Sequence, residues 1–110
     1  AQVVVFNIRN VCDSGTNQIK ILVANDGVRK IDEFIVRSYR SDSDVEQDKM
    51  NFATLGIDSF NIDDDTITVD SEPIKQIELI PSVTINNKKV TCSNNIRRFG
   101  NLESTGLEAC

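Results

Sequence analysis

The stretch that decides the fold is Gln18-Ile19-Lys20-Ile21-Leu22-Val23-Ala24-Asn25-Asp26-Gly27. Within it, the large apolar residues Ile19, Ile21 and Val23 alternate with Lys20, Leu22 and Ala24, which is the period of a strand with one buried face. The Asn-Asp-Gly triplet at 25–27 tolerates positive φ, so the chain can reverse there. The stretch therefore predicts a strand, a turn and a further strand.

The segments on either side of this stretch continue the same pattern. Further strands are expected at 3–11, 30–39, 66–69, 74–80, 83–85 and 89–92, with turns at 13–17, 63–65, 81 and 93–95. Asn86-Asn87 favours a hairpin turn of type I′. Residues 40–49 are polar and acidic and are expected to form a surface loop or one weak helical turn, whereas residues 50–60 fit neither period.

Turn signals recur about every 8–12 residues and no segment has helical periodicity, a pattern typical of sandwiches. We therefore predict an all-β fold, an antiparallel β-sandwich of seven or eight strands. The length of 110 residues suits a single domain over 1–110.

The composition argues against several classes of function. The net charge is −5 and the sequence pI is about 4.6, which disfavours nucleic acid and anionic membrane surfaces as partners. The chain has no histidine, so it lacks the commonest general base and zinc ligand. With no tryptophan and only Tyr39 as a tyrosine, stacking platforms for sugars or bases are scarce. No apolar run of about 18 residues occurs, so no membrane contact by this segment itself is expected.

Two acidic groups could hold calcium. The first alternates along the chain, at Asp42, Asp44, Glu46 and Asp48. An EF-hand loop counted from the first of these would need Gly at its sixth position and Glu at its twelfth, but Gln47 and Ala53 stand there. We therefore favour a solvated acidic loop for this group.

The second group is Asp63-Asp64-Asp65, with Asp58 and Asp70 nearby in the sequence. A turn is the favoured interpretation, and a calcium site is the alternative. Paired carboxylates could support glycoside hydrolysis, but among 17 acidic residues some pair always looks plausible. We predict no enzyme, no catalytic residue, no cofactor and no metal site.

A small basic group is formed by Lys88-Lys89 and Arg97-Arg98. We interpret it as a guard against pairing of exposed sheet edges. A docking patch for an acidic partner is the alternative.

Cys12, Cys92 and Cys110 match no zinc spacing. In an oxidising compartment they would give one disulfide and one leftover thiol, and three buried thiols in a cytoplasmic protein are the alternative. All three pairings are possible. Loop-closure entropy favours a long-range bridge and kinetics favours the short one. A sandwich whose first strand runs beside its last would bring Cys12 near Cys110, and we favour that pair.

The run Asn10-Val11-Cys12-Asp13-Ser14-Gly15, the strand at 19–24 with its Asn-Asp-Gly turn, and the segment from Ile31 through Phe34-Ile35-Val36 resemble one known family. They are similar to the start of the globular domain of archaeal archaellins and archaeal type IV pilin-like proteins. Ile77-Glu78-Leu79-Ile80-Pro81 followed by Val83-Thr84-Ile85 looks like the later strand pair of that family around a Pro turn.

The resemblance implies an immunoglobulin-like sandwich exposed outside the cell, at the cell surface. It implies a structural subunit of an archaellum- or pilus-like filament, or an accessory protein of such a filament. Its partners would be other copies of itself or components of the cell envelope. The family carries an N-terminal hydrophobic helix, which is absent here, and we expect it upstream of Ala1. The alternative function is a calcium- or carbohydrate-binding extracellular sandwich.

Overall fold

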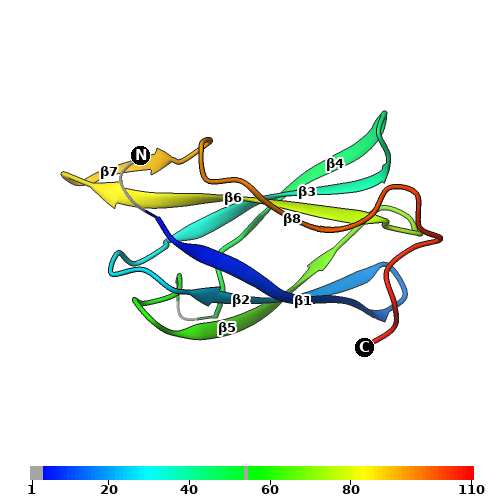
Figure 1. Cartoon of the computed structure of the whole chain (residues 1–110), viewed down its shortest axis with the longest axis horizontal. Coiled ribbons are helices and arrows are strands. Elements are labelled where there is room, and N and C mark those ends of the chain that lie inside the picture. The colour runs from blue at the N-terminus through cyan, green and yellow to red at the C-terminus, as the bar shows by residue number, and fades with distance from the viewer. Residues whose placement is uncertain (1–3, 54) are drawn as a thin grey trace.

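The computed structural model describes residues 4–53 and 55–110. Its two antiparallel sheets face each other across one core (Figure 1). The eight strands are β1 (Phe6–Gly15), β2 (Gln18–Asn25), β3 (Glu33–Ser41), β4 (Asp44–Met50), β5 (Ile62–Thr68), β6 (Gln76–Ile85), β7 (Lys88–Thr91) and β8 (Arg97–Gly100). The predicted all-β antiparallel sandwich is confirmed.

The smaller sheet has the order β1-β2-β5, and the larger sheet has the order β4-β3-β6-β7, with β8 pairing the other half of β6. The decisive stretch is β2, and its residues Ile19, Ile21 and Val23 are buried as predicted. From the facing sheet Phe34, Val36 and further apolar side chains close the core. Alternation along each strand thus gives both sheets one apolar inner face.

The turns between the late strands follow the prediction. Asn86 and Asn87 both have positive φ, 52° and 63°, as a type I′ hairpin between β6 and β7 requires. The next turn, at 93–95, is closed by a 3.0 Å hydrogen bond from the amide of Asn95 to the carbonyl of Cys92.

Three expectations about local structure are wrong. The acidic segment 40–49, expected as a loop, contains most of β4, which pairs with β3. The expected turn at 63–65 lies inside β5, paired with β2, and the expected turn at 13–17 begins as strand, because β1 runs to Gly15.

The expected Pro turn is also wrong, because Pro81 lies inside one continuous β6. Its carbonyl accepts a 2.8 Å bond from the amide of Cys92, so its missing N–H faces the same side. On that side β8 pairs with residues 76–79 of β6, and the pairing of β6 with β7 begins only at Ser82. Pro81 therefore occupies a gap between two partners, where a strand tolerates proline.

The last ten residues, 101–110, form the C-terminal strap, which joins the two sheets at one end of the sandwich. The amide of Leu107 donates to Ile74 next to β6, and the amide of Asp13 in β1 donates to Glu108. The strap begins behind Gly100, where φ is +99° and a Cβ would collide with the carbonyl of Lys75, so only glycine is accommodated there. No helix of the length and apolarity needed to cross a membrane occurs in residues 4–53 and 55–110.

Candidate functional site

The outer face of the larger sheet carries two carboxylates that the sequence analysis did not single out. Glu78 of β6 has a side chain only 4% exposed, and it is paired with Arg37 on one side and Arg98 on the other, at 3.0 and 2.8 Å. The hydroxyl of Tyr39 donates to the same carboxylate at 3.3 Å. Each buried charge therefore has the partners that burial demands.

Glu33 of β3 repeats the arrangement. Its side chain is 10% exposed and lies 2.7 Å from Nζ of Lys89 in β7 and 3.9 Å from Nζ of Lys49 in β4. The hydrogen bond to Glu33 raises the pKa of Lys89. Glu33 directly precedes an apolar strand segment, and Glu78 lies inside one. A carboxylate in such a segment is expected to be buried and paired, so the sequence pattern could have indicated both residues.

In the basic group, Lys88-Lys89 and Arg97-Arg98, three side chains make contacts inside the domain in addition to any protection of a sheet edge. Lys89 and Arg98 point to the outer face and bind the two buried carboxylates. Arg97, next along β8, turns the other way and lies over the ring of Phe6, 5.7 Å from its centroid. These cations thus link strands within the domain.

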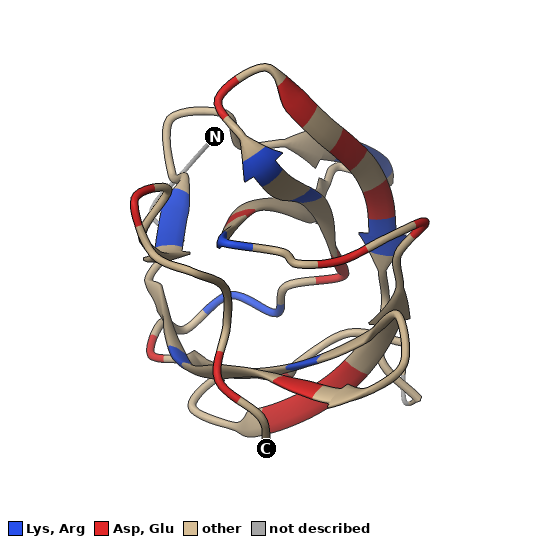
Figure 2. Cartoon of the chain, turned by 90° about the vertical axis from the view of Figure 1, so that its right-hand side faces the viewer, with Lys and Arg blue, Asp and Glu red and all other residues tan. Residues whose placement is uncertain are grey.

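The two acidic groups lie on two different strands, β4 at one edge of the larger sheet and β5 at one edge of the smaller sheet (Figure 2). Arg40 of β3 binds both Asp44, by two hydrogen bonds at 3.0 and 3.1 Å, and Glu46, at 2.5 Å. The contact with Arg40 lowers the pKa of Asp44. Glu46 also accepts a bond from the amide of Asp70.

Asp48 is the exception in this group, because its Oδ2 is buried and has no hydrogen-bond partner. Burial and the neighbouring charges of Glu46 and Asp70 raise its pKa. In the second acidic group, Asp65 is used internally, since its Oδ2 accepts a bond from the amide of Phe52. Asp64 lies 3.8 Å from Lys20 on the outer face of the smaller sheet. Within the described residues, no three acidic or cysteine side chains are placed together to hold a metal ion.

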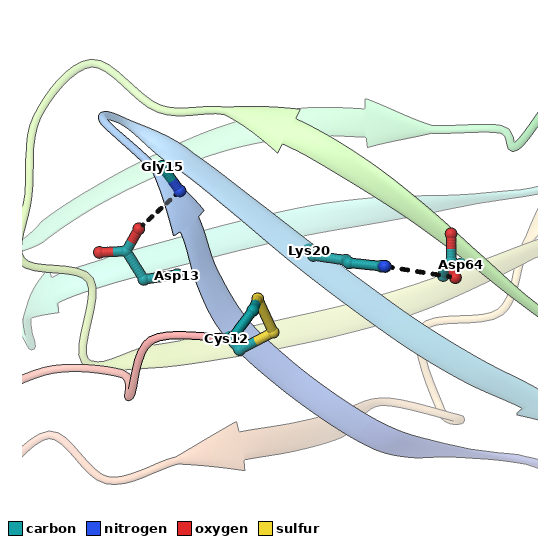
Figure 3. The surroundings of a disulfide bond; sticks show 6 residues. Cys12, Asp13, Gly15, Lys20 and Asp64 are labelled. Atoms are coloured by element: carbon teal, nitrogen blue, oxygen red, sulfur yellow. Dashed lines mark hydrogen bonds and ion pairs between the residues drawn. A yellow bond between two sulfur atoms is a disulfide. The ribbon is translucent and has the colours of Figure 1, made fainter.

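The cysteine pair favoured from the sequence is the pair that the structure joins. Cys12 of β1 and Cys110 at the end of the strap form a disulfide, with their Cα atoms 4.9 Å apart (Figure 3). The neighbouring backbone is paired as well, because Asp13 donates to Glu108 and accepts from Cys110, at 2.8 and 2.9 Å. Cys92 remains a free, fully buried thiol, and burial raises its pKa.

A cavity of about 410 Å³ lies between β1, the end of β8 and the strap. Its apolar lining comes from Val11, Phe99, Leu107 and Ala109, and its polar lining includes Asn10, Lys75 and Glu108. The volume is within the range of pockets that enclose a small ligand or a large side chain. It is therefore a candidate binding site. It was not predicted from the sequence, because its lining comes from segments far apart in the chain.

No protein-family model matches the chain, and no curated protein or solved structure matches it at a significant level. The functional assignment therefore depends on the sequence pattern and on the geometry described above.

Proposed function

We propose that the chain is an extracellular structural module rather than an enzyme. It would be the globular domain of a subunit of an archaellum- or pilus-like surface filament, or of an accessory protein that holds such a filament at the cell envelope. The observation that supports this most directly is the disulfide-fastened strap, which ties the C-terminal Cys110 to Cys12 in β1 (Figure 1). The domain is elongated, 41 Å in its longest dimension, and the bridge fastens the strap at one end of it.

The chemistry of the described residues fits a load-bearing role. Glu33 and Glu78, the two most buried carboxylates, are each held between two cations from neighbouring strands. Such pairs fix strand register more than they activate a reactive group. A disulfide in a small β domain is typical of oxidising compartments outside the cytoplasm, and this supports the cell-surface location.

The test is the coding sequence immediately upstream of Ala1, together with labelling of cells. We expect about 20 apolar residues there, preceded by a short basic leader, and antibodies against the domain should decorate surface filaments or their bases in immunogold electron microscopy. A soluble continuation upstream, combined with cytoplasmic labelling, would refute the proposal.

The rival function is an extracellular sandwich that binds calcium or carbohydrate. The one observation in its favour is the buried, unpartnered Oδ2 of Asp48, since the described residues contain no set of three carboxylates placed together for a metal ion. Calorimetry with calcium separates the two functions. Micromolar binding accompanied by a higher melting temperature would favour the rival, because a ligand that binds only the folded state raises its stability.

A further inference from the structure

The strap leaves part of the edge of β1 open. The amide and the carbonyl of Asp13 both bond to the strap, to Glu108 and Cys110 at 2.8 and 2.9 Å, so both point away from β2. Val11 pairs with Ile21 in the same uninterrupted register, two residues earlier. Because strand residues two apart direct their backbone groups to the same side, the amide and carbonyl of Val11 also point away from β2.

Val11 has no strand to pair with on that side. The strap runs beside β1 only at Asp13, where a parallel bridge joins it to Ala109. It has already diverged at Leu107, whose amide donates to Ile74 instead. In the described part of the chain, no group forms a hydrogen bond with the open side of Val11, although this residue is only 3% exposed. A buried backbone amide and carbonyl without partners are rare and costly, so they indicate a place for a ligand.

An open edge of the larger sheet faces this position, in β8, which lies beside β1 (Figure 1). The amide of Asn101 donates to Lys75 at 3.1 Å and continues the ladder between β8 and β6. The carbonyl of Gly100 belongs to the same planar peptide group and therefore points the other way, away from β6. Among the described residues it accepts no hydrogen bond. The cavity of about 410 Å³, which we call the strap cavity, is lined by residues 10–12 and 99–101, so both open edges border it.

The side chains around the strap cavity favour an apolar group. Val11, Phe99 and Leu107 supply its apolar wall, and the last two also pack against the core of the sandwich. Lys75 and Glu108 carry opposite charges and both border the cavity, so charge selects neither an anionic nor a cationic ligand. A neutral ligand that combines an apolar group with hydrogen-bond donors and acceptors fits this lining best.

We propose that the strap cavity binds a short extended peptide segment of a partner protein, which pairs with β1 at Val11. Addition of a strand to an open edge is a general mode of peptide recognition, in which backbone bonds give affinity and side-chain pockets give specificity. The segment takes the place beside β1 that the strap leaves free. Residues directly opposite each other share a face of the sheet. The peptide residue opposite Val11 is therefore apolar and enters the cavity, and its two neighbours are polar.

The other outer strands are less suited to such pairing. Along β4, β5 and β7 the sequence places charged side chains at several positions, at 44, 46, 48 and 49, at 63–65 and at 88–89. Charges along an edge are a common protection against the addition of a strand. The open part of β1, residues 10–12, carries no charged side chain, so this edge is the one we expect a peptide to select.

Hydrogen exchange of the oxidised chain tests the open edge before any peptide is added. The amide of Val11 should exchange at least about tenfold faster than that of Asp13, because only the second is hydrogen-bonded to the strap. The two amides lie on the same strand and point to the same side, so each serves as the reference for the other. Equal protection of both amides overturns the proposal.

The probe for binding is the neutral peptide acetyl-Thr-Thr-Val-Thr-Thr-amide, in which one apolar residue lies between polar neighbours. We expect a Kd on the order of 1 mM, because few backbone bonds form and each contributes about 1 kcal/mol. At about 5 mM peptide, exchange of the Val11 amide should then slow about sixfold. Changes in amide chemical shifts should be confined to residues 10–12, 99–101 and the strap. No change, or changes centred on β4 or β5, overturns the proposal.

A second peptide with the same side chains, N-methylated at its three central residues, is the matched control. It lacks the N–H groups that would pair with the edge, so it should leave the exchange of Val11 unchanged. Equal binding of the two peptides would show that the cavity recognises an apolar group alone, and this outcome also overturns the strand pairing.

Substitutions in the chain complete the test. Ala109→Trp should fill the cavity from its exposed rim and weaken binding at least about tenfold, whereas Thr66→Trp, exposed on β5, should bind like the unsubstituted chain. Val11→Pro is the second variant in case the first fails to fold. It removes the open N–H and is compatible with β1, because this N–H does not bond to β2. Binding by either variant that equals the binding of Thr66→Trp contradicts the proposed site.

This inference goes beyond the proposed filament function and does not rest on it, because binding is measured on the isolated chain. An absence of labelled surface filaments rejects the filament function alone. An absence of peptide binding rejects the peptide site alone.

Discussion

Nε of Arg98 in β8 lies 2.8 Å from a carboxylate oxygen of Glu78 in β6. The other oxygen of this carboxylate accepts a 3.0 Å bond from Arg37 in β3. One buried anion thus joins three adjacent strands of the larger sheet across its outer face. The four-residue strand β8 gains in this way a charged attachment in addition to its backbone ladder.

Replacing this anion should loosen the sheet. We expect Glu78→Gln to lower the free energy of unfolding by about 1–2 kcal/mol, the scale of hydrogen bonds to charged groups. The loss stays moderate because Arg37 and Arg98 are 39% and 57% exposed and can turn to water. Urea unfolding measures the change. Glu103→Gln on the exposed strap removes the same charge and should change stability little, and equal losses in both variants would contradict this account.

The side-chain amide of Asn25 should be essential for the end of the sandwich where the β2–β3 and β4–β5 connections meet. Asn25→Ala removes three hydrogen bonds, two to the carbonyls of Arg29 and Ile57 and one from the amide of Gly27. We expect a loss of about 2–3 kcal/mol, because three hydrogen bonds of a buried side chain are lost together, although the carbonyl of Ile57 keeps its bond from the amide of Ile31. Chemical denaturation provides the value, and Asn94→Ala in the exposed turn at 93–95 is the control. A loss below about 0.5 kcal/mol would show that water replaces the amide without penalty.

Asp48 should make the protein less stable as pH rises. Its folded-state pKa lies above the ordinary value of 3.8, so the native state binds the proton more tightly than the unfolded chain does. Its destabilising effect is therefore absent below that ordinary value and complete above the raised pKa. Asp48→Asn should stabilise by about 0.5–1 kcal/mol near pH 7, and the gain should disappear in acid.

Denaturant titrations at a series of pH values test this prediction. Asp42→Asn changes the net charge equally, from an exposed position in the β3–β4 turn, and serves as the control. A gain for Asp48→Asn that persists unchanged in acid would show that its cause is not the ionisation of the carboxyl group.

The thiols should titrate in a defined pattern. The oxidised chain should react with no thiol reagent while folded, because Cys92 is buried and its pKa is raised. After denaturation one thiol should appear, and reductant should release the other two. Peptide mapping should recover the Cys12–Cys110 bridge. Three free thiols in the denatured, unreduced protein would contradict both the disulfide and the cell-surface location.

Removing the bridge should be costly. The disulfide closes a loop with a sequence separation of 98, so the joint replacement of Cys12 and Cys110 by Ser should lower stability by about 4.7 kcal/mol in the chain-entropy treatment. Urea unfolding of the oxidised, reduced and doubly substituted chains measures it. The reduced and substituted forms should agree with each other, and a difference between them would indicate strain or residual structure.

The fold class could be predicted from the sequence because the inner strands obey the simple period-two rule. The alternation at 19, 21 and 23 predicts which side chains of β2 are buried, and Asn86-Asn87 predicts its turn from conformational preference alone. Such signals are local, so no partner strand is needed to recognise them.

The errors fell where a distant partner decides the structure. The strand β4 is acidic at 44, 46 and 48 and becomes a strand because Arg40 of β3 neutralises two of these carboxylates. Pro81 was predicted to form a turn because proline is rarely tolerated inside a paired strand. It is tolerated in β6 because it lies between the segments that pair with β8 and with β7, and this arrangement exists only in the folded sheet. The strap cavity escaped prediction for the same reason. The archaellin-like assignment itself stays a prediction.

The Cys12–Cys110 bridge also determines how the domain would carry tension. If a pull is applied between the first described residue, Val4, and Cys110, the covalent path runs along β1 to Cys12 and crosses the sulfur atoms directly. The residues between the two cysteines include all the strands from β2 to β8. They lie outside that path. Force would have to peel the first half of β1 from β2, and even then only a few residues could be drawn out. The domain would thus behave under load as a nearly inextensible link.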